Sequence, residues 1–478
     1  MKTVLTHGYF LAEDVKEQHI MKPYPPLGIL YISAWLKKHG QTCEVFDSTF
    51  STKDLLLQYL TLEKPGIVAI YTNLMTKVNV LSIIAFIRNS ETLKETFIVL
   101  GGPEVTYSAE NFLAYGANCI VVGEGEQTML EIVRAVEKGE PNKLGEIPGI
   151  VFREATGEIV QTPEREKLKD LDLLPMPDRQ AIRIENYLEV WKARHGKNAV
   201  SVSTMRGCPY TCKWCSRAVY GLSYRRRSPG MVVEELGWIQ KHYAPDSIWF
   251  VDDVFTVSHK WLQGFVEAMK ASELRISYEC ISRADRLNDS VLDMLKQTGC
   301  FRIWIGAESG SQRVIDAMDR RVDVGQTRDM IKLARSKGME AGTFIMLGYP
   351  GETEADIEET IHHLMVSQPD HYTITLAYPI KGTELYQEVE SDITDLPEWA
   401  SSSDREINFR RTYSPGYYRF ALMRVRHAVA YGQLKQQPLR QPWKLLTHKA
   451  KAGIAKILMR LERLRNIPHI ASQKKTLP

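Results

Sequence analysis

The strongest constraint on the fold is an alternation of short apolar strands with amphipathic helices, which occurs twice along the chain. Residues 1–140 read as five strand–helix units, with strands such as GIVAIYT at 66–72 and FIVLGG at 97–102. From about residue 198 the alternation starts again, with six expected strands separated by long helices. Nearly continuous apolar strands joined by helices are typical of parallel sheets. The sequence therefore predicts two parallel α/β sheets in one chain.

The first series predicts a doubly wound sheet with a ligand site at one edge. Ligands of such sheets bind at the carboxyl ends of the strands. No G-x-G-x-x-G follows the first strand and no P-loop is present, so a dinucleotide role is not expected. The residues expected at the carboxyl ends are Thr72, Asn73, Gly101, Gly102, Gly123, Glu124, Gly125 and Glu126.

The second series predicts either a partial β/α barrel or another open sheet. Both place their chemistry at the carboxyl ends of the strands. A hairpin at 149–161 and a charged, proline-spotted linker separate the two series. We expect regions at 1–145 (first sheet), 146–196 (hairpin and linker), 197–395 (second sheet) and 396–478 (helical and basic).

Charge is distributed unevenly along the chain. The net charge of +3 combines a mildly acidic body with a tail, residues 431–478, that holds eleven Lys and Arg and one acid. A basic amphipathic tail is most often a solvated, partner-facing surface. Contact with a membrane surface is the functional alternative, and nucleic acid is less favoured because aromatic side chains are few.

The terminus and the cysteine usage favour a cytoplasmic protein. The first residues resemble neither a signal peptide nor a transit sequence, and no run of 18 apolar residues occurs. Seven cysteines in 478 residues are too few for a disulfide framework. Four of them lie scattered in apolar contexts, where a cysteine behaves as a small core residue. A reducing cytoplasmic setting is therefore expected.

The remaining cysteines, Cys208, Cys212 and Cys215, form a C-x3-C-x2-C cluster just after the first strand of the second series. Structural zinc requires four ligands, usually as two separated pairs, and only His195 or His242 could complete such a site. An iron–sulfur cluster held by three thiolates, with one iron open to another ligand, is the alternative that the spacing favours.

This motif, with an aromatic residue before its last cysteine, resembles the signature of the radical S-adenosylmethionine (SAM) superfamily. The resemblance covers about residues 198–390. It implies a partial (β/α)6 barrel and a [4Fe–4S] cluster on the three cysteines, with the amino and carboxylate groups of SAM on the fourth iron. One electron from the cluster would cleave SAM to methionine and a 5′-deoxyadenosyl radical, which abstracts a hydrogen atom from substrate.

The same resemblance suggests which residues contact SAM. Polar residues follow the second, third and fourth barrel strands, and a guanidinium suits the SAM carboxylate. Glycines after the fifth strand would shape the wall against adenine. Each acid could instead be a solvated loop carboxylate or a helix cap, and the tryptophan could be plain packing. The expected SAM residues are Trp214, Asp252, Asp253, Ser282, Arg283, Glu308 and Gly348.

The first 140 residues resemble the cobalamin-binding subfamily of these enzymes. Its recurrent marks are present as PPLG at 25–28, GGPE at 101–104 and GEGEQT at 123–128. The resemblance implies that the strand-end residues named above contact cobalamin. The D-x-H-x-x-G motif that supplies a cobalt-binding histidine in other cobalamin proteins is absent, and His7 has the wrong spacing. A domain that packs on the barrel without a cofactor is the alternative.

Together these resemblances imply an oxygen-sensitive methyltransferase. Methyl transfer from methylcobalamin to carbon or phosphorus of a small or lipid-like molecule is expected, with an external electron donor such as a flavodoxin or ferredoxin. A ring closure, rearrangement or oxidation is the alternative, followed by a cobalt-free radical SAM enzyme. A structural zinc protein is the alternative outside enzymes.

Overall fold

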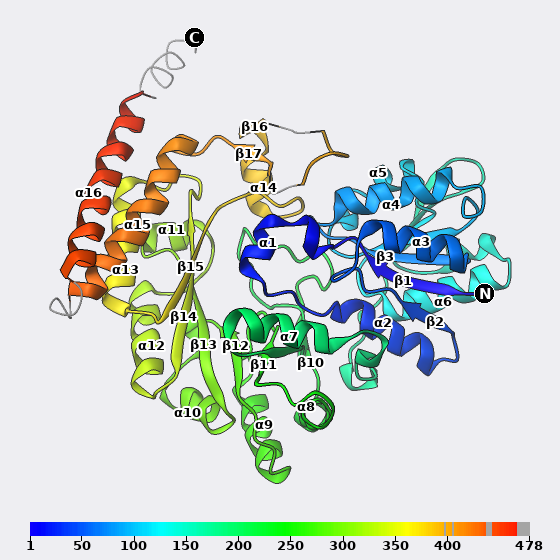
Figure 1. Ribbon diagram of the computed structural model, residues 1–478, viewed down its shortest axis with the longest axis horizontal. Helices are drawn as coiled ribbons and strands as arrows, with labels where there is room; N and C mark the ends of the chain where they lie inside the picture. Colours follow the sequence, from blue (N-terminus) through cyan, green and yellow to red (C-terminus); the bar gives the residue numbers. More distant parts are fainter. Residues whose placement is uncertain (396–397, 404–405, 436–441, 466–478) are drawn as a thin grey trace.

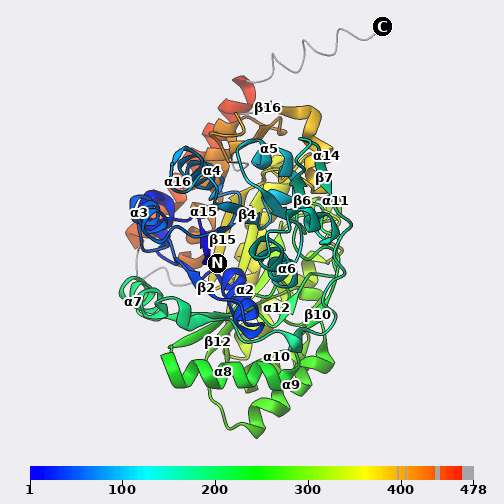
Figure 2. The ribbon, with the colours of Figure 1, turned by 90° about the vertical axis from the view of Figure 1, so that its right-hand side faces the viewer.

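A computed structural model describes residues 1–395, 398–403, 406–435 and 442–465. Two sheets lie side by side, the first near the N-terminus and the second near the middle of the chain, and helices at the C-terminal end flank the second (Figures 1 and 2). The fold class expected from the sequence is confirmed: a doubly wound parallel sheet precedes an open parallel half-barrel and a helical C-terminal region.

The first sheet has seven strands in the order β2-β1-β3-β4-β5-β6-β7. The first five are parallel, and the predicted hairpin adds two antiparallel strands at one edge. The strands are β1 (Thr3–His7), β2 (Cys43–Val45), β3 (Ile67–Tyr71), β4 (Phe97–Gly101), β5 (Cys119–Val121), β6 (Ile150–Arg153) and β7 (Ile159–Gln161). Their apolar side chains are buried on both faces, as the continuous apolar runs predict.

Helices cover both faces of this sheet. Side chains of α3, α4 and α5 pack with one face, and those of α2 and α6 pack with the other. The helices are α1 (Val15–Ile20), α2 (Leu27–Lys38), α3 (Lys53–Glu63), α4 (Lys77–Asn89), α5 (Ala109–Ala114) and α6 (Glu126–Glu137). The loops after the strands therefore gather at one edge of the sheet.

The second sheet has six parallel strands in the order β15-β14-β13-β12-β11-β8. Strands adjacent in this order follow one another along the chain, and the sheet curves without closing (Figure 1). The strands are β8 (Ala199–Val202), β11 (Ser247–Phe250), β12 (Tyr278–Ser282), β13 (Cys300–Glu308), β14 (Glu340–Leu347) and β15 (His371–Leu376). The helices between them are α8 (Pro229–Tyr243), α9 (His259–Ala271), α10 (Asp289–Gln297), α11 (Gln312–Ala317), α12 (Val324–Ser336) and α13 (Glu354–Ser367).

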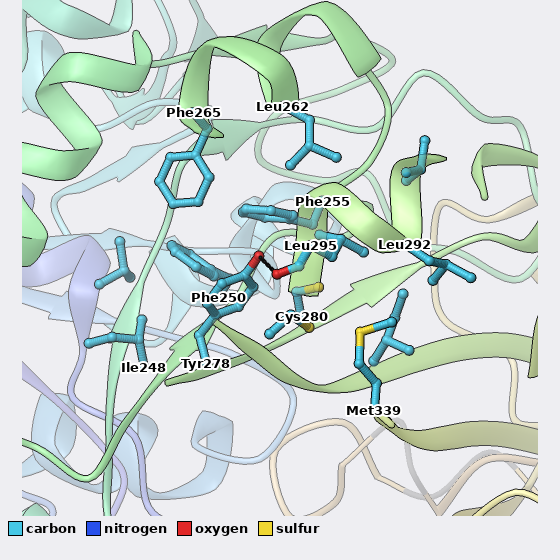
Figure 3. Close-up of a cluster of buried hydrophobic side chains, with 14 of the residues drawn as sticks. Ile248, Phe250, Phe255, Leu262, Phe265, Tyr278, Cys280, Leu292, Leu295 and Met339 are labelled. Atoms are coloured by element: carbon cyan, nitrogen blue, oxygen red, sulfur yellow. Dashed lines mark hydrogen bonds between the residues drawn. The ribbon is translucent and has the colours of Figure 1, made fainter. Parts of the chain in front are cut away.

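An aromatic cluster forms the core between this sheet and its helices (Figure 3). Phe250, Phe255, Phe265 and Tyr278 are fully buried there. The Tyr278 hydroxyl lies 3.3 Å from the Leu295 carbonyl oxygen, to which it donates a hydrogen bond, so its polar end is satisfied inside the core. The four cysteines outside the motif are also buried, as expected.

The region 146–196 is more ordered than a surface linker. It contains a helix that our reading of the sequence omitted, α7 (Ile184–His195), in addition to the hairpin. The Tyr187 hydroxyl contacts the Asp47 carboxylate at 2.9 Å, and the Trp191 indole N–H donates to the Pro23 carbonyl oxygen at 2.8 Å. Ile184 and Leu188 of the same helix pack into the core of the second sheet, so this segment joins the two sheets.

The chain after β15 has two parts that pack in different places. Helix α14 (Glu384–Val389) and the short strands β16 (Ile393–Asp395) and β17 (Asn408–Phe409) pack with α11 and Trp214. Helices α15 (Pro415–Lys435) and α16 (Pro442–Arg465) pack on the outside of the half-barrel. In Figure 1, α15 and α16 lie at the left edge, with α13 behind them. No helix in the described ranges is both long and apolar enough to cross a membrane.

Candidate active site

The three clustered cysteines lie on an excursion from the carboxyl end of the second sheet. After β8 the chain forms β9 (Met205–Arg206), passes through the cysteines and returns as β10 (Arg225–Arg226), which pairs antiparallel with β9. Gly207 has φ of 80°. A Cβ at this position would lie 2.3 Å from the Ser223 hydroxyl oxygen. Glycine therefore lets the two arms of this hairpin approach each other.

Two buried arginines hold the middle of the cysteine loop. Arg283 and Arg320 place guanidinium nitrogens 3.7 and 3.9 Å from the Cys212 sulfur. Arg283 also lies over the Tyr210 ring at 3.8 Å and donates to the Arg320 carbonyl oxygen at 2.7 Å. Positive charge beside a cysteine stabilises its thiolate, the form that binds metal. The sequence reading assigned Arg283 to SAM and did not identify Arg320.

The donor set fits an iron–sulfur cluster. Burial raises the pKa of the Cys208 thiol, but a coordinating metal deprotonates a thiol outright. Among the described residues, no three His, Cys, Asp or Glu side chains are gathered for one ion. Three thiolates of a cubane bind three different irons and so stand farther apart. His195 and His242 contact backbone carbonyl oxygens instead, and neither completes a zinc site.

The two predicted aspartates occupy different environments. The buried Asp252 carboxylate accepts hydrogen bonds from the Thr204 amide at 2.7 Å, the Thr204 hydroxyl and the Met205 amide at 3.2 Å. Arg226 lies 3.5 Å from it. Asp252 therefore holds the start of the cysteine hairpin. The neighbouring Asp253 is exposed toward a small cavity, so it is the aspartate free to meet a ligand.

Glu308 is the second acid that faces the cysteine loop. It ends β13 at a register shift, with φ of 60°, an uncommon value for a residue with a side chain. Its carboxylate lies 3.5 Å from Arg320. Burial raises the pKa of Glu308, and Arg320 and Arg283 oppose that shift. The carboxyl group is therefore held beside the residues that contact Cys212.

The other predicted SAM residues have structural partners. Ser282 shares a hydrogen bond with the Thr256 hydroxyl at 2.5 Å. The Gly348 amide donates to the buried Glu352 carboxylate at 2.6 Å. Trp214 packs against a small apolar cluster and lies 5.7 Å from the Arg320 guanidinium. Their contact with SAM stays a prediction.

A cavity of about 460 Å³ lies at the carboxyl edge of the first sheet. The PPLG segment forms one wall, and seven of the eight residues predicted to contact cobalamin line it. These seven are Asn73, Gly101, Gly102, Gly123, Glu124, Gly125 and Glu126. Thr72 lies behind the wall, where its amide donates to the Gly101 carbonyl oxygen at 2.7 Å. At Gly102, with φ of 112°, a Cβ would lie 2.4 Å from the Thr72 carbonyl oxygen.

The cavity suits a large, mostly apolar ligand that needs little anchoring charge. Aliphatic side chains, glycines and four tyrosines that the sequence reading missed line it: Tyr9, Tyr24, Tyr71 and Tyr220. His7 is at the wall, but both ring nitrogens are occupied, one by Asp47 at 3.1 Å and the other by the Tyr9 amide at 3.2 Å. Such a cradle would hold cobalamin without a bond from His7 to cobalt.

A smaller cavity of about 160 Å³ lies between the first cavity and the cysteine hairpin. Asp252, Asp253 and Gly207 are part of its lining. Both cavities share four wall residues, Leu27, Gly28, Arg206 and Tyr220. The site of the first sheet therefore adjoins the hairpin that carries the cysteines.

Arg206 joins the two halves of the site. It ends β9, two residues before Cys208, and its buried guanidinium pairs with the Glu126 carboxylate, with one contact at 3.1 Å. Glu124 lies 3.8 Å from Arg206 and 2.6 Å from Arg225. The two arms of the hairpin are thus bound to the GEGE loop, a contact that the sequence reading did not predict.

A glycine-rich cavity on one sheet thus adjoins a three-cysteine loop on a half-barrel, and comparisons with known proteins identify both halves. The Radical SAM superfamily model matches residues 202–364, and the B12 binding domain model matches residues 19–133. The chain is 30% identical over 371 residues to "Uncharacterized methyltransferase PH0819" of Pyrococcus horikoshii, an alignment that covers 76% of this chain and 78% of that protein.

Other similar proteins share both halves. The anaerobic magnesium-protoporphyrin IX monomethyl ester cyclase of Rubrivivax gelatinosus is 27% identical over 77% of this chain and 66% of its own length. The cobalamin-dependent SAM radical enzyme OxsB, solved with aqua-cobalamin and SAM, superposes with a TM-score of 0.75 at 15% identity over 100% of this chain and 81% of OxsB. The methyltransferase TsrM of Kitasatospora setae superposes with a TM-score of 0.68 at 17% identity, over 83% of this chain and 76% of TsrM.

The chain belongs to the cobalamin-binding radical SAM family. It is therefore an enzyme whose cofactors are a [4Fe–4S] cluster, SAM and cobalamin. The family and the cofactors that the sequence suggested are confirmed. The individual residues assigned to each cofactor stay predictions.

Proposed function

We propose that this enzyme transfers a methyl group from SAM, through cobalamin, to a carbon or phosphorus atom of a small or lipid-like molecule. Two of the similar proteins described above are named methyltransferases. The observation that carries the proposal is the shared wall of the two cavities. A methyl donor in the larger cavity would lie next to the chamber beside the cysteine loop, where substrate can be activated.

The cysteine hairpin and its arginines form the part that handles SAM. When bound, the cluster and SAM supply reductive cleavage of a carbon–sulfur bond, and cobalamin supplies transfer of a methyl group. Cys208, Cys212 and Cys215 would hold the cluster, with Arg283 and Arg320 neutralising its negative charge at Cys212. Asp253 and Glu308 are the acids available to the SAM amino group.

The larger cavity would hold the corrin by shape more than by charge. Glycine backbone at 101–102 and 123–125 allows close approach, and the aromatic and aliphatic walls exclude water. Glu124 and Glu126 are held by Arg206 and Arg225, so these carboxylates orient the wall of the cavity. We assign them a positioning role.

A substrate-independent experiment tests the proposal. Anaerobically reconstituted enzyme is given hydroxocobalamin, a strong reductant and SAM with a deuterated methyl group. We expect S-adenosylhomocysteine in solution and one labelled methyl group on the protein-bound corrin, both measured by mass spectrometry. Retained corrin without label, accompanied by 5′-deoxyadenosine alone, would contradict methyl transfer.

That second outcome would favour ring closure, rearrangement or oxidation. The 27% identity to the magnesium-protoporphyrin cyclase is the observation that supports this second candidate. In either reaction the cluster needs one electron from outside the chain, and we propose a flavodoxin or ferredoxin as its donor. A cytoplasmic location, where thiols stay reduced, would suit this chemistry.

A further inference from the structure

Helix α16 carries an apolar stripe that no described residue covers. Large side chains recur along it three, four or eight residues apart and are between 47% and 81% exposed. They are Trp443, Leu446, Ile454, Ile457, Leu461 and Leu464. At 100° per residue these positions fall on one face of the helix. Contiguous exposed apolar surface of this kind is uncommon on soluble proteins and marks a contact site.

The opposite face of the same helix is fully used by the fold. Ala452, Ala455 and Met459 are buried, and α15 is the helix that packs against α16. In Figure 1, α16 is the outermost element on its side of the molecule. The stripe therefore points away from the protein and contributes nothing to its core.

Basic side chains border the stripe on both sides. The helix contains seven Lys and Arg residues and one acid, Glu462. By helical spacing, Lys449 and Arg460 flank one edge, and Lys451 and Arg465 flank the other. Across the described ranges, no ion pair is made by Lys444, Lys449, Lys451 or Arg460. Their positive charge remains available to an external partner.

We infer that α16 docks this enzyme on an anionic phospholipid surface. An apolar stripe between two basic edges matches the boundary between acyl chains and negatively charged headgroups. A second copy of α16 would bring like charges together along both edges, which disfavours self-association. A nucleic acid would pair with the lysine and arginine side chains but leave the apolar stripe exposed to water. The partner is therefore a membrane surface, contacted without spanning.

Flotation with vesicles tests this inference on the full-length protein. We expect binding to vesicles of phosphatidylcholine with one quarter phosphatidylglycerol, weaker binding as salt rises, and no binding to pure phosphatidylcholine. Ile457→Glu with Leu461→Glu should reduce binding at least about tenfold, because two carboxylates would enter the interface. Leu55→Glu with Leu62→Glu on α3 is the matched control. These leucines are 52% and 78% exposed.

A second variant separates charge from folding defects. Lys449→Gln with Arg460→Gln keeps the apolar stripe. It should weaken binding to the anionic vesicles by about tenfold or more, since each lysine or arginine near such a surface adds to the binding free energy. Circular dichroism checks that all variants fold. Equal flotation of the wild type and the Ile457→Glu/Leu461→Glu variant would overturn the inference. A wild-type dimer that dissociates in this variant would also overturn it. Binding of the protein to an oligonucleotide but not to vesicles would do the same.

Discussion

At the residue scale, the cysteines of the loop differ from the other four in what surrounds them. Cys208, Cys212 and Cys215 lie between the two arms of a hairpin, and two guanidinium groups contact the Cys212 sulfur. The other four are buried in the two sheets, where they pack as small apolar residues. Their surroundings therefore separate the three predicted cluster ligands from core residues of the same type.

Replacing any one of the three loop cysteines by alanine should abolish the cluster. Reconstituted wild type should be brown and contain iron and sulfide, and Cys208→Ala, Cys212→Ala and Cys215→Ala should each lose both. Visible absorption and metal analysis measure this result. The control is Cys119→Ala on β5, which should keep the colour. Full iron content in a loop variant would contradict the assignment.

Glu352 should make the stability of the protein depend on pH. Its carboxyl is fully buried with a hydrogen bond from Gly348, and burial raises its pKa to about 8. Asp356 adds to this shift and Arg313 opposes it. A raised pKa means that the folded state holds the proton more tightly than the unfolded chain, so stability is lost as pH rises from about 4.5 to 8.

Glu352→Gln should remove that loss, because glutamine can accept the same hydrogen bond without ionising. Each unit of pKa difference corresponds to about 1.4 kcal/mol, so the two proteins should diverge by a few kcal/mol across this range. Melting at pH 5, 6.5 and 8 measures the difference. Glu166→Gln, on an exposed side chain, should follow the wild type. If the melting temperatures of wild type and Glu352→Gln change equally with pH, Glu352 does not hold a proton in the folded state.

At the scale of elements, the β9–β10 hairpin depends on one glycine. A Cβ on Gly207 would lie 2.3 Å from the Ser223 hydroxyl and 2.5 Å from its carbonyl oxygen, at φ of 80°. Gly207→Ala should therefore separate the arms of the hairpin and reduce iron loading after reconstitution. Gly230→Ala on α8 meets no atom within 4 Å. It should load iron normally and be no less stable, since alanine favours helix by about 1 kcal/mol over glycine.

The sequence predicted elements better than it predicted contacts. Strands such as β3 and β4 were predicted correctly because continuous apolar runs report burial directly. Helix α7 was missed because charges and nearby prolines obscured the spacing of Ile184, Tyr187 and Trp191. Its length and buried face appear only when the two sheets are in place.

Site contacts were harder because they join distant parts of the chain. Arg320 reaches Cys212 across 108 residues, and Arg206 reaches Glu126 across 80. No local periodicity encodes such pairings. Asp252 illustrates the converse: its position at a strand end is typical of a ligand site, yet its carboxylate is taken up by backbone amides.

At the scale of the whole molecule, the buried pair of Arg206 and Glu126 ties the two sheets together. Arg206→Met would leave Glu126 buried without its closest partner, and breaking such a pair costs about 3–5 kcal/mol. We expect a lower melting temperature for Arg206→Met, and weaker retention of hydroxocobalamin in equilibrium dialysis. Adding Glu126→Leu should restore most of the melting temperature, since an apolar pair can replace a buried ion pair.

The two readouts separate folding from positioning. Corrin retention should stay weak in the double variant, because the wall between the cavities would have lost its orientation. Lys169→Gln, which breaks a pair with more than 80% of the lysine exposed, should change neither quantity. Normal corrin retention in the double variant would show that this pair serves stability alone.

The wall common to both cavities also makes their occupants thermodynamic partners. An occupant of either cavity contacts Leu27, Gly28, Arg206 and Tyr220, so each alters the surface that the other meets. Linkage is reciprocal: if corrin tightens SAM binding by some factor, SAM tightens corrin binding by the same factor. The overall constant for binding both cofactors is then the same whichever of them binds first. If that factor exceeds one, a cell short of one cofactor would hold less of the other on this enzyme.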